Sequence, residues 1–126
     1  MIWPCLNYRD APAAIAFLTT AFGLVVESIH RTGDHVEHAE LAFPEGGAIM
    51  LGSAASDGSP FERLSTGTNG VYVVTDDPDV LYERATSAGA HIIRELRDDP
   101  HGSRGFVAAD SEGNLWSFGT YRGERH

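Results

Sequence analysis

The chain repeats one pattern of residues twice, with a period of about 67 residues. Asp10 matches Asp77, and the Glu-Gly pair at 45–46 matches the pair at 112–113. The glycines that follow the two expected helices, Gly23 and Gly89, depart from this period by one residue. Such a repeat indicates one supersecondary unit used twice, and two facing units usually enclose a space. The residues that line this space are therefore the first place to look for a function.

Each half predicts a strand, a helix and three further strands. In the first half the strand covers 1–8, and the carboxylate of Asp10 can cap the helix that follows. Pro12 is tolerated in the first helical turn, and Gly23 ends the helix because it adopts a left-handed conformation without strain. Extended segments at 24–30, 35–43 and 48–52 complete this half.

The second half predicts the same order of elements. A strand at 71–75 precedes a helix that opens at Asp77 and ends at Gly89, and strands follow at 91–96, 105–109 and 115–121. The polar stretch 53–69 predicts a crossover loop between the halves. We therefore expect a single domain over 1–126, with module one at 1–52, the loop at 53–69 and module two at 70–121.

Composition narrows the classes of partner. The net charge of −9 argues against nucleic acid, because phosphate binding needs clustered Lys and Arg. No apolar run approaches the ~20 residues that span a membrane, and the N-terminus lacks the pattern of a secretory signal. Cys5 is the single cysteine, which suits a reducing compartment. These features predict a cytoplasmic protein that binds neither nucleic acid nor membrane.

Three motifs carry a resemblance to a known family: YRDAPAAIAFLTTAFG (8–23), DDPDVLYERATSAGA (76–90) and HGSRGFVAADSEGNLWSFGTY (101–121). In this order they resemble the vicinal oxygen chelate superfamily, which includes glyoxalases, extradiol dioxygenases and bleomycin-resistance proteins. The resemblance implies an α+β fold of two tandem βαβββ modules. Their curled mixed sheets surround a cavity, with the helices on the outer face. It also implies a homodimer, which is common among members of this size.

The resemblance also implies where a metal would bind. Family enzymes hold a divalent ion with ligands from the first and last strands of each module, at positions that correspond to Trp3, Met50, Gly70 and Ser117. None of these is a His, Asp, Glu or Cys, the residues that bind such ions in proteins. We therefore expect no metal and no other cofactor.

The alternation of side chains along a strand predicts which residues line the cavity. The aromatic and apolar members carry contact surface, and the polar members give specificity, as in most small-molecule pockets. Arg104, in the loop before a strand, either clamps a ligand anion or braces the turn at Asp110. The predicted ligand-binding residues are Trp3, Asn7, His38, Glu40, Met50, Tyr72, Ser117 and Arg104.

His38 and Glu40 are the pair of residues best suited to take part in chemistry. Two residues apart on one strand, they project from the same face with bases ~7 Å apart. A carboxylate next to an imidazole can orient it for proton transfer. The pair can equally satisfy a wet sheet face by hydrogen bonding, recognise a ligand, or supply ligands to a relocated metal.

Three functions fit these residues. The leading hypothesis is a metal-independent protein that binds an aromatic or cationic small molecule, similar to bleomycin-resistance proteins, with Trp3, Tyr72 and Met50 as stacking surface and Glu40 as the negative charge. The second is a metal-dependent lyase, isomerase or dioxygenase that uses His38 and Glu40. The third is an acid–base enzyme with His38 as base and Tyr72 or Ser117 as donor.

Overall fold

The structure is a computed structural model that describes residues 1–55 and 58–124. Module one contains β1 (Cys5–Tyr8), α1 (Ala11–Ala21), β2 (Val25–Thr32), β3 (His35–Ala42) and β4 (Ala48–Ser53). A 3₁₀ helix, η1 (Pro60–Arg63), lies in the connection. Module two contains β5 (Gly70–Val74), α2 (Pro78–Ser87), β6 (His91–Asp98), β7 (Arg104–Ala109) and β8 (Leu115–Gly119). The predicted α+β fold of two tandem βαβββ modules is confirmed.

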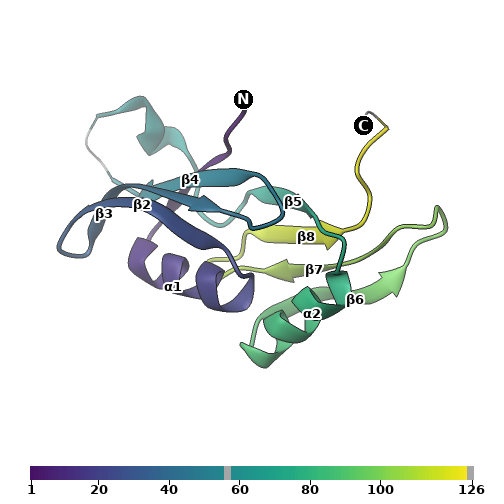
Figure 1. The fold of residues 1–126 in the computed structure, drawn as a ribbon. Coiled ribbons are helices and arrows are strands. Elements are labelled where there is room, and N and C mark those ends of the chain that lie inside the picture. Colours follow the sequence, from purple (N-terminus) through teal and green to yellow (C-terminus); the bar gives the residue numbers. More distant parts are fainter. Residues whose placement is uncertain (56–57, 125–126) are drawn as a thin grey trace.

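Each module forms its own four-stranded mixed sheet. The strand order is β1-β4-β3-β2 in module one and β5-β8-β7-β6 in module two. The first and last strands of each module pair in parallel, and the other neighbours are antiparallel. The two curled sheets lie side by side, and both helices cover the same side of them (Figure 1). The opposite side, called here the open face, is covered by neither α-helix (Figure 1).

The helix ends confirm the signals in the sequence. Asp10 Oδ1 accepts a hydrogen bond from the backbone N–H of Ala13 at 3.2 Å. Asp77 Oδ1 accepts the corresponding bond from Val80 at 3.3 Å. These carboxylates satisfy amide groups that have no partner within the first helical turn. Gly23 and Gly89 follow the helices with φ values of +76° and +81°, in the left-handed region.

One apolar core joins the two modules under the sheets. Phe22, which follows α1, packs against Phe118 of β8 with ring centroids 4.9 Å apart, and against Trp116 at 5.5 Å. All three side chains are buried, and so is Leu18 of α1. Trp116 and Phe118 therefore lie on the side of β8 opposite to Ser117. Because rings from both modules share this core, the modules form one packed unit.

Reciprocal carboxylate contacts hold the two modules together. Glu112 of module two accepts backbone hydrogen bonds from Arg9 at 2.7 Å and Asp10 at 2.8 Å. Glu45 of module one accepts the Thr75 hydroxyl at 2.7 Å and the backbone N–H of Asp76 at 2.8 Å. Each carboxylate therefore bonds to the strand-to-helix turn of the other module.

The largest differences from the predicted elements lie at the N-terminus and in the connection, while β6 ends two residues later and β8 two residues earlier than predicted. Strand pairing begins at Cys5 instead of Met1, since Pro4 has no N–H to contribute to a ladder. The connection expected to be only a loop contains η1. Among the described residues, no helix is long and apolar enough to cross a membrane.

Candidate functional site

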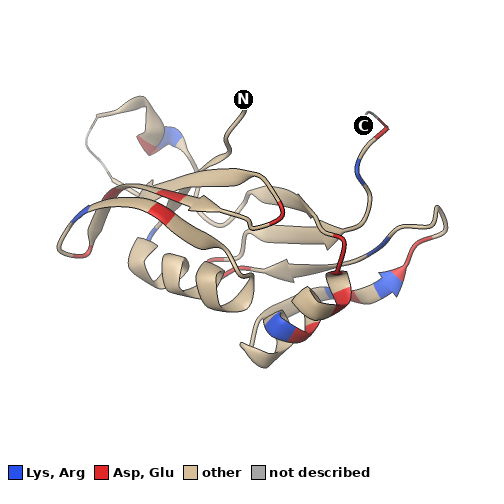
Figure 2. Ribbon diagram, in the orientation of Figure 1, with Lys and Arg blue, Asp and Glu red and all other residues tan. Residues whose placement is uncertain are grey.

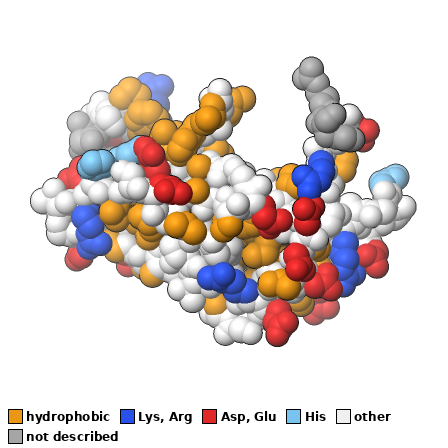
Figure 3. All heavy atoms as spheres, in the orientation of Figure 1, with side chains coloured by type: hydrophobic (Ala, Val, Ile, Leu, Met, Phe, Trp, Pro, Cys, Tyr) orange, Lys and Arg blue, Asp and Glu red, His pale blue; other side chains and the backbone are white. Residues whose placement is uncertain are grey.

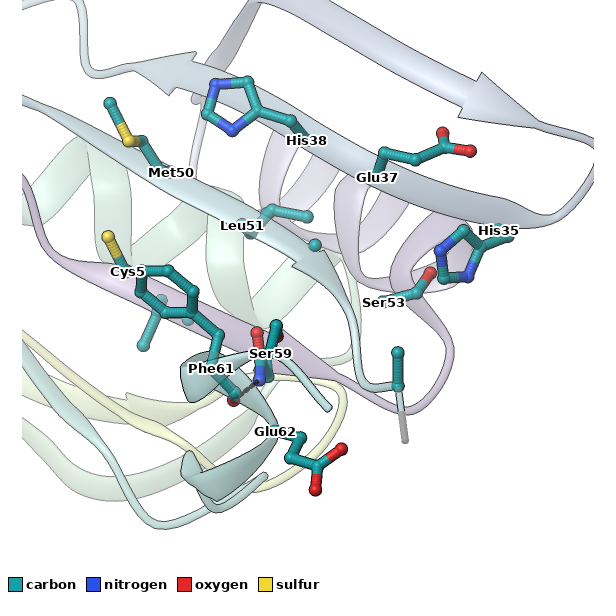
Figure 4. Close-up of a pocket in the computed structure, with 14 residues that line it drawn as sticks. Cys5, His35, Glu37, His38, Met50, Leu51, Ser53, Ser59, Phe61 and Glu62 are labelled. Atoms are coloured by element: carbon teal, nitrogen blue, oxygen red, sulfur yellow. Dashed lines mark hydrogen bonds between the residues drawn. The ribbon is translucent and has the colours of Figure 1, made fainter. Parts of the chain in front are cut away.

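The open face of module one carries a cavity of about 300 Å³. Strands β1, β3 and β4 form its floor, and η1 forms one side. Figure 4 shows His38 and Met50 on one side of the cavity, with Cys5 and Phe61 on the other. The lining thus combines two sulfur atoms and an aromatic ring with a few polar groups. That mixture is typical of sites for organic small molecules.

The 3₁₀ helix is held over the cavity by one polar side chain of the sheet. Asn7 Nδ2 donates to the backbone oxygen of Phe61 at 2.9 Å. The Phe61 side chain is 58% exposed and lines the cavity. Phe61 is not among the predicted ligand-binding residues, although Pro60 at a helix-opening position and an aromatic residue in a polar stretch were signals for this segment.

His38 and Glu40 contact each other on this face. His38 Nε2 lies 2.8 Å from Glu40 Oε2, and both side chains are about one-third exposed, at 38% and 33%. The ring of His30 on β2 stacks beside His38 with centroids 6.4 Å apart. His30 was missed from the sequence because β-bulges shift the β2–β3 register and bring it opposite His38.

Carboxylates give the surroundings of this cavity a negative charge. Glu37 lines it beside His38, and Glu62 contributes from η1. The hydroxyl of Thr32 donates to Glu37 Oε1 at 2.8 Å and holds the pKa of that carboxyl below its usual range. Figure 2 shows further acidic positions on β2 and β3. Glu37 is therefore ionised at neutral pH.

The open face of module two carries a separate hollow of about 590 Å³, lined by Tyr72, Ser117 and Arg104 among others. The Tyr72 hydroxyl donates to the backbone oxygen of Tyr121 at 2.6 Å. Partial burial raises the pKa of Tyr72, so the phenol stays neutral at physiological pH. Tyr72 thus stands as a fixed aromatic wall of this hollow.

Arg104 is occupied by carboxylates of its own module. Its guanidinium bonds to Asp79 of α2 at 2.8 and 3.2 Å and approaches Asp98 of β6 to 3.2 Å. The hydrogen bonds to Asp79 and Asp98 raise the pKa of Arg104, and Arg104 lowers the pKa of Asp79. Arg104 braces β7 against α2 and β6, and the Asp110 turn is stabilised by other residues.

The positions that hold a metal in related enzymes do not fit one here. Met50 and Ser117 both face the open side of their sheets, and Gly70 offers no side chain. Trp3 is half-buried in the segment before β1 and lines neither the cavity of module one nor the hollow on the open face of module two. Within residues 1–55 and 58–124, no group of three or more His, Cys, Asp or Glu is arranged to bind an ion. The donors are a thioether and a hydroxyl, which are poor ligands for Zn²⁺ or Fe²⁺.

Seven of the eight predicted site residues thus fall into two groups, and Trp3 belongs to neither. Asn7, His38 and Met50 line the cavity of module one, and Glu40 touches His38 there. Tyr72, Ser117 and Arg104 line the hollow of module two. In the described part of the chain the sheets curl without closing, so these residues line two separate hollows of the open face.

Comparisons with known proteins agree with this geometry. Residues 2–118 match the model of the Glyoxalase/Bleomycin resistance protein/Dioxygenase superfamily. The chain is 31% identical over 122 residues to the uncharacterized protein Mb0911c of Mycobacterium bovis, covering 92% of this chain and 80% of that protein. The crystal structure of TioX from Micromonospora sp. ML1 is similar with a TM-score of 0.77 and 30% identity, over 94% of this chain and 98% of that one. A glyoxylase/bleomycin resistance protein/dioxygenase domain from Frankia sp. EAN1pec shares the fold, with a TM-score of 0.71 and 20% identity over 97% of each chain.

Proposed function

Since the chain belongs to the Glyoxalase/Bleomycin resistance protein/Dioxygenase superfamily, we propose that it is a metal-independent protein that binds a planar aromatic or cationic small molecule. The observation that carries this proposal is the cavity of module one, in which apolar side chains meet carboxylates. The ligand lies on Cys5, Met50 and Phe61 and places its positive charge near Glu37 and Glu40.

The energetics of such contacts support a specific binder. Stacking on an aromatic ring such as Phe61 contributes about 0.5–1.5 kcal/mol beyond area burial. Contacts with the Met50 thioether add to the binding free energy, and this flexible side chain adapts to ligands of different shape. A cation held near an ionised carboxylate gains a charge-assisted contact, and the Glu37 carboxylate remains charged at neutral pH. These terms together favour a flat cation over a neutral molecule of the same shape.

A homodimer belongs to the same proposal. Exposed apolar side chains include Met1 and Ile2 of the N-terminal segment, Val25 at the start of β2 and Phe61 of η1. Figure 3 shows hydrophobic side chains gathered around the N-terminal segment and the connection that contains η1. Exposed apolar surface of this kind is typical of protein–protein contacts.

The test is a thermal-shift titration with 9-aminoacridine, a planar aromatic cation, and with neutral acridine as the comparison. Saturating 9-aminoacridine should raise the Tm by several degrees, because a ligand at a hundred times its Kd stabilises the folded state by about 2.7 kcal/mol. Glu37→Gln combined with Glu40→Gln should reduce this shift, while Glu83→Gln on the helix side should leave it unchanged. Equal shifts with acridine and 9-aminoacridine would contradict the charge preference.

Elemental analysis of protein purified without chelator tests the metal independence. A stoichiometric divalent ion would overturn this part of the proposal and favour the second candidate function, a metal-dependent or acid–base lyase, isomerase or dioxygenase. One observation favours that alternative: the 2.8 Å contact between His38 Nε2 and Glu40 Oε2, which is suited to proton transfer. In an enzyme, His38→Ala abolishes turnover; in a binding protein it only weakens binding.

A further inference from the structure

Four side chains form a row across the open face of module two. In the register of the sheet, Tyr72 pairs with Ser117, Ser117 with Val107, and Val107 with Arg94. Neighbouring strands lie about 4.8 Å apart, so the ends of this row are separated by roughly 14 Å. The row therefore places an aromatic ring at one end, a cation at the other and two small side chains between them.

Arg94 is the unpaired charge of this row. Its guanidinium makes no hydrogen bond or ion pair with any described residue, and it lines the hollow. The carboxylates on the same hollow have partners: Asp99 bonds to Arg97 at 3.2 Å, and Glu124 accepts the Tyr121 hydroxyl at 3.3 Å. An arginine fork without a partner in a concave site is suited to a carboxylate, which it can bind through two parallel hydrogen bonds.

The rest of the row is fixed in a form that suits an aromatic ligand. A side chain at Gly119 would approach the Tyr72 hydroxyl to 3.0 Å, so the absence of a side chain lets Tyr72 lie over this strand. The hydrogen bond to Tyr121 then holds the ring in place. The hydroxyl of Ser117 makes no hydrogen bond with the described residues and can donate to the ligand.

The equivalent row of module one carries a charge of the opposite sign, on β3 instead of the edge strand. The period of the repeat brings Cys5 onto Tyr72, Met50 onto Ser117 and Glu40 onto Val107. The one-residue offset of the helix ends brings Ser28 onto Arg94, and the register confirms the row Cys5–Met50–Glu40–Ser28. The charged member is a carboxylate in module one and a guanidinium in module two. The two faces therefore select ligand groups of opposite sign.

We propose that the hollow of module two is a binding site for an aromatic carboxylate. The carboxylate is held by the Arg94 fork, the ring lies against Tyr72, and the Ser117 hydroxyl donates to a polar group between them. A hollow of about 590 Å³ is within the range of small-molecule sites, about 300–1,000 Å³. This site differs from the proposed cation site in its face, its residues and the charge of its ligand.

The experiment is a titration of ¹⁵N-labelled protein with 2-naphthoate, followed by amide chemical shifts. The amides at 71–73, 106–108 and 116–118 should shift in a saturable way. Arg94→Gln should raise the Kd at least about tenfold, as expected for the loss of a charge-assisted pair. Arg97→Gln is the matched control, because Arg97 is already paired with Asp99, and it should leave the Kd within about twofold. Arg94→Lys should give an intermediate Kd, since it keeps the charge and loses the fork.

Neutral 2-naphthamide separates charge from shape and should bind at least about tenfold more weakly than 2-naphthoate. Equal affinity for the two probes would overturn the proposal. Equal weakening by Arg94→Gln and Arg97→Gln would also overturn it, because it would indicate general electrostatic attraction. Amide chemical-shift changes confined to module one would also overturn the proposal. None of these outcomes bears on 9-aminoacridine binding, so the two proposals fail or stand separately.

Discussion

At the scale of single residues, Asp110 organises the polar contacts between the modules. Its Oδ2 accepts the Tyr8 hydroxyl at 2.6 Å, the Trp116 indole N–H at 3.0 Å and the Asn114 amide at 3.0 Å. Its Oδ1 accepts backbone N–H groups of Glu112 and Asn114. A buried carboxylate costs free energy unless its lone pairs are satisfied, and here five donors satisfy them.

Tyr8→Phe removes one donor from this carboxylate and should lower the free energy of unfolding by about 1.5–3 kcal/mol, the range for a hydrogen bond to a charged group. Urea denaturation measures the change. Tyr82→Phe is the matched control, because the Tyr82 ring packs on Phe106 while its hydroxyl makes no hydrogen bond with the described residues.

The contact between Tyr8 and Asp110 also makes the stability of the protein depend on pH. Burial, and then the hydrogen bond to Asp110, raise the pKa of Tyr8 far above its ordinary value, whereas a tyrosine in the unfolded chain ionises near pH ~10. The stabilisation is therefore complete below about pH 10 and is lost as the pH rises further. Above that pH the stability of the wild type should fall more steeply than that of Tyr8→Phe; parallel curves would contradict this assignment.

At the scale of elements, α2 caps the end of α1. Arg84 of α2 donates from Nε to the backbone oxygen of Thr20 at 2.9 Å and from Nη2 to that of Thr19 at 3.0 Å. These carbonyls have no partner within α1, and a cation is favourable at the negative end of the helix dipole. A side chain at Gly23 would come within 3.1 Å of the guanidinium. Gly23 thus ends α1 and also leaves space for the Arg84 guanidinium that caps it.

Arg84→Ala should lower the free energy of unfolding by about 1–2 kcal/mol, because two carbonyls lose a charged donor. Chemical denaturation followed by circular dichroism gives the value. Arg63→Ala in η1 is the comparison, since its guanidinium has no hydrogen bond to the described residues, and it should change stability little. Equal losses in the two variants would show that Arg84 acts through general charge.

The elements themselves could be predicted because their signals are local. The caps at Asp10 and Asp77 and the stops at Gly23 and Gly89 lie next to the helices that they limit. The contact of His30 with His38 depends on bulges, which add a residue to one strand without a marker in the sequence. Alternation along single strands still placed Met50 and Ser117 on the open faces.

At the scale of the whole molecule, the repeat also determines how the two modules are joined. Glu45 and Glu112 occupy equivalent turns, and each bonds to the turn that opens the helix of the other module. The sequence showed the repeated Glu-Gly pairs but not their partners, since the reach of a carboxylate across the modules is fixed only by tertiary packing. For the same reason the sequence left open whether a cavity is built within one chain or across two.

Glu45→Gln and Glu112→Gln should each lower the free energy of unfolding by about 1–2 kcal/mol, because each replaces a charged acceptor of two hydrogen bonds by a neutral amide. The double variant should lose nearly the sum, as expected for separate sites. Glu83→Gln, an exposed glutamate of α2, should be neutral. A loss in only one of the two single variants would refute the equivalence of the turns.

These reciprocal turns have a consequence for how the two copies of the unit can diverge. The groups that interlock them lie at the strand ends, away from the rows Cys5–Met50–Glu40–Ser28 and Tyr72–Ser117–Val107–Arg94. Substitutions in either row leave the joint intact. One row can therefore carry a carboxylate, Glu40, and the other a guanidinium, Arg94, on the same architecture.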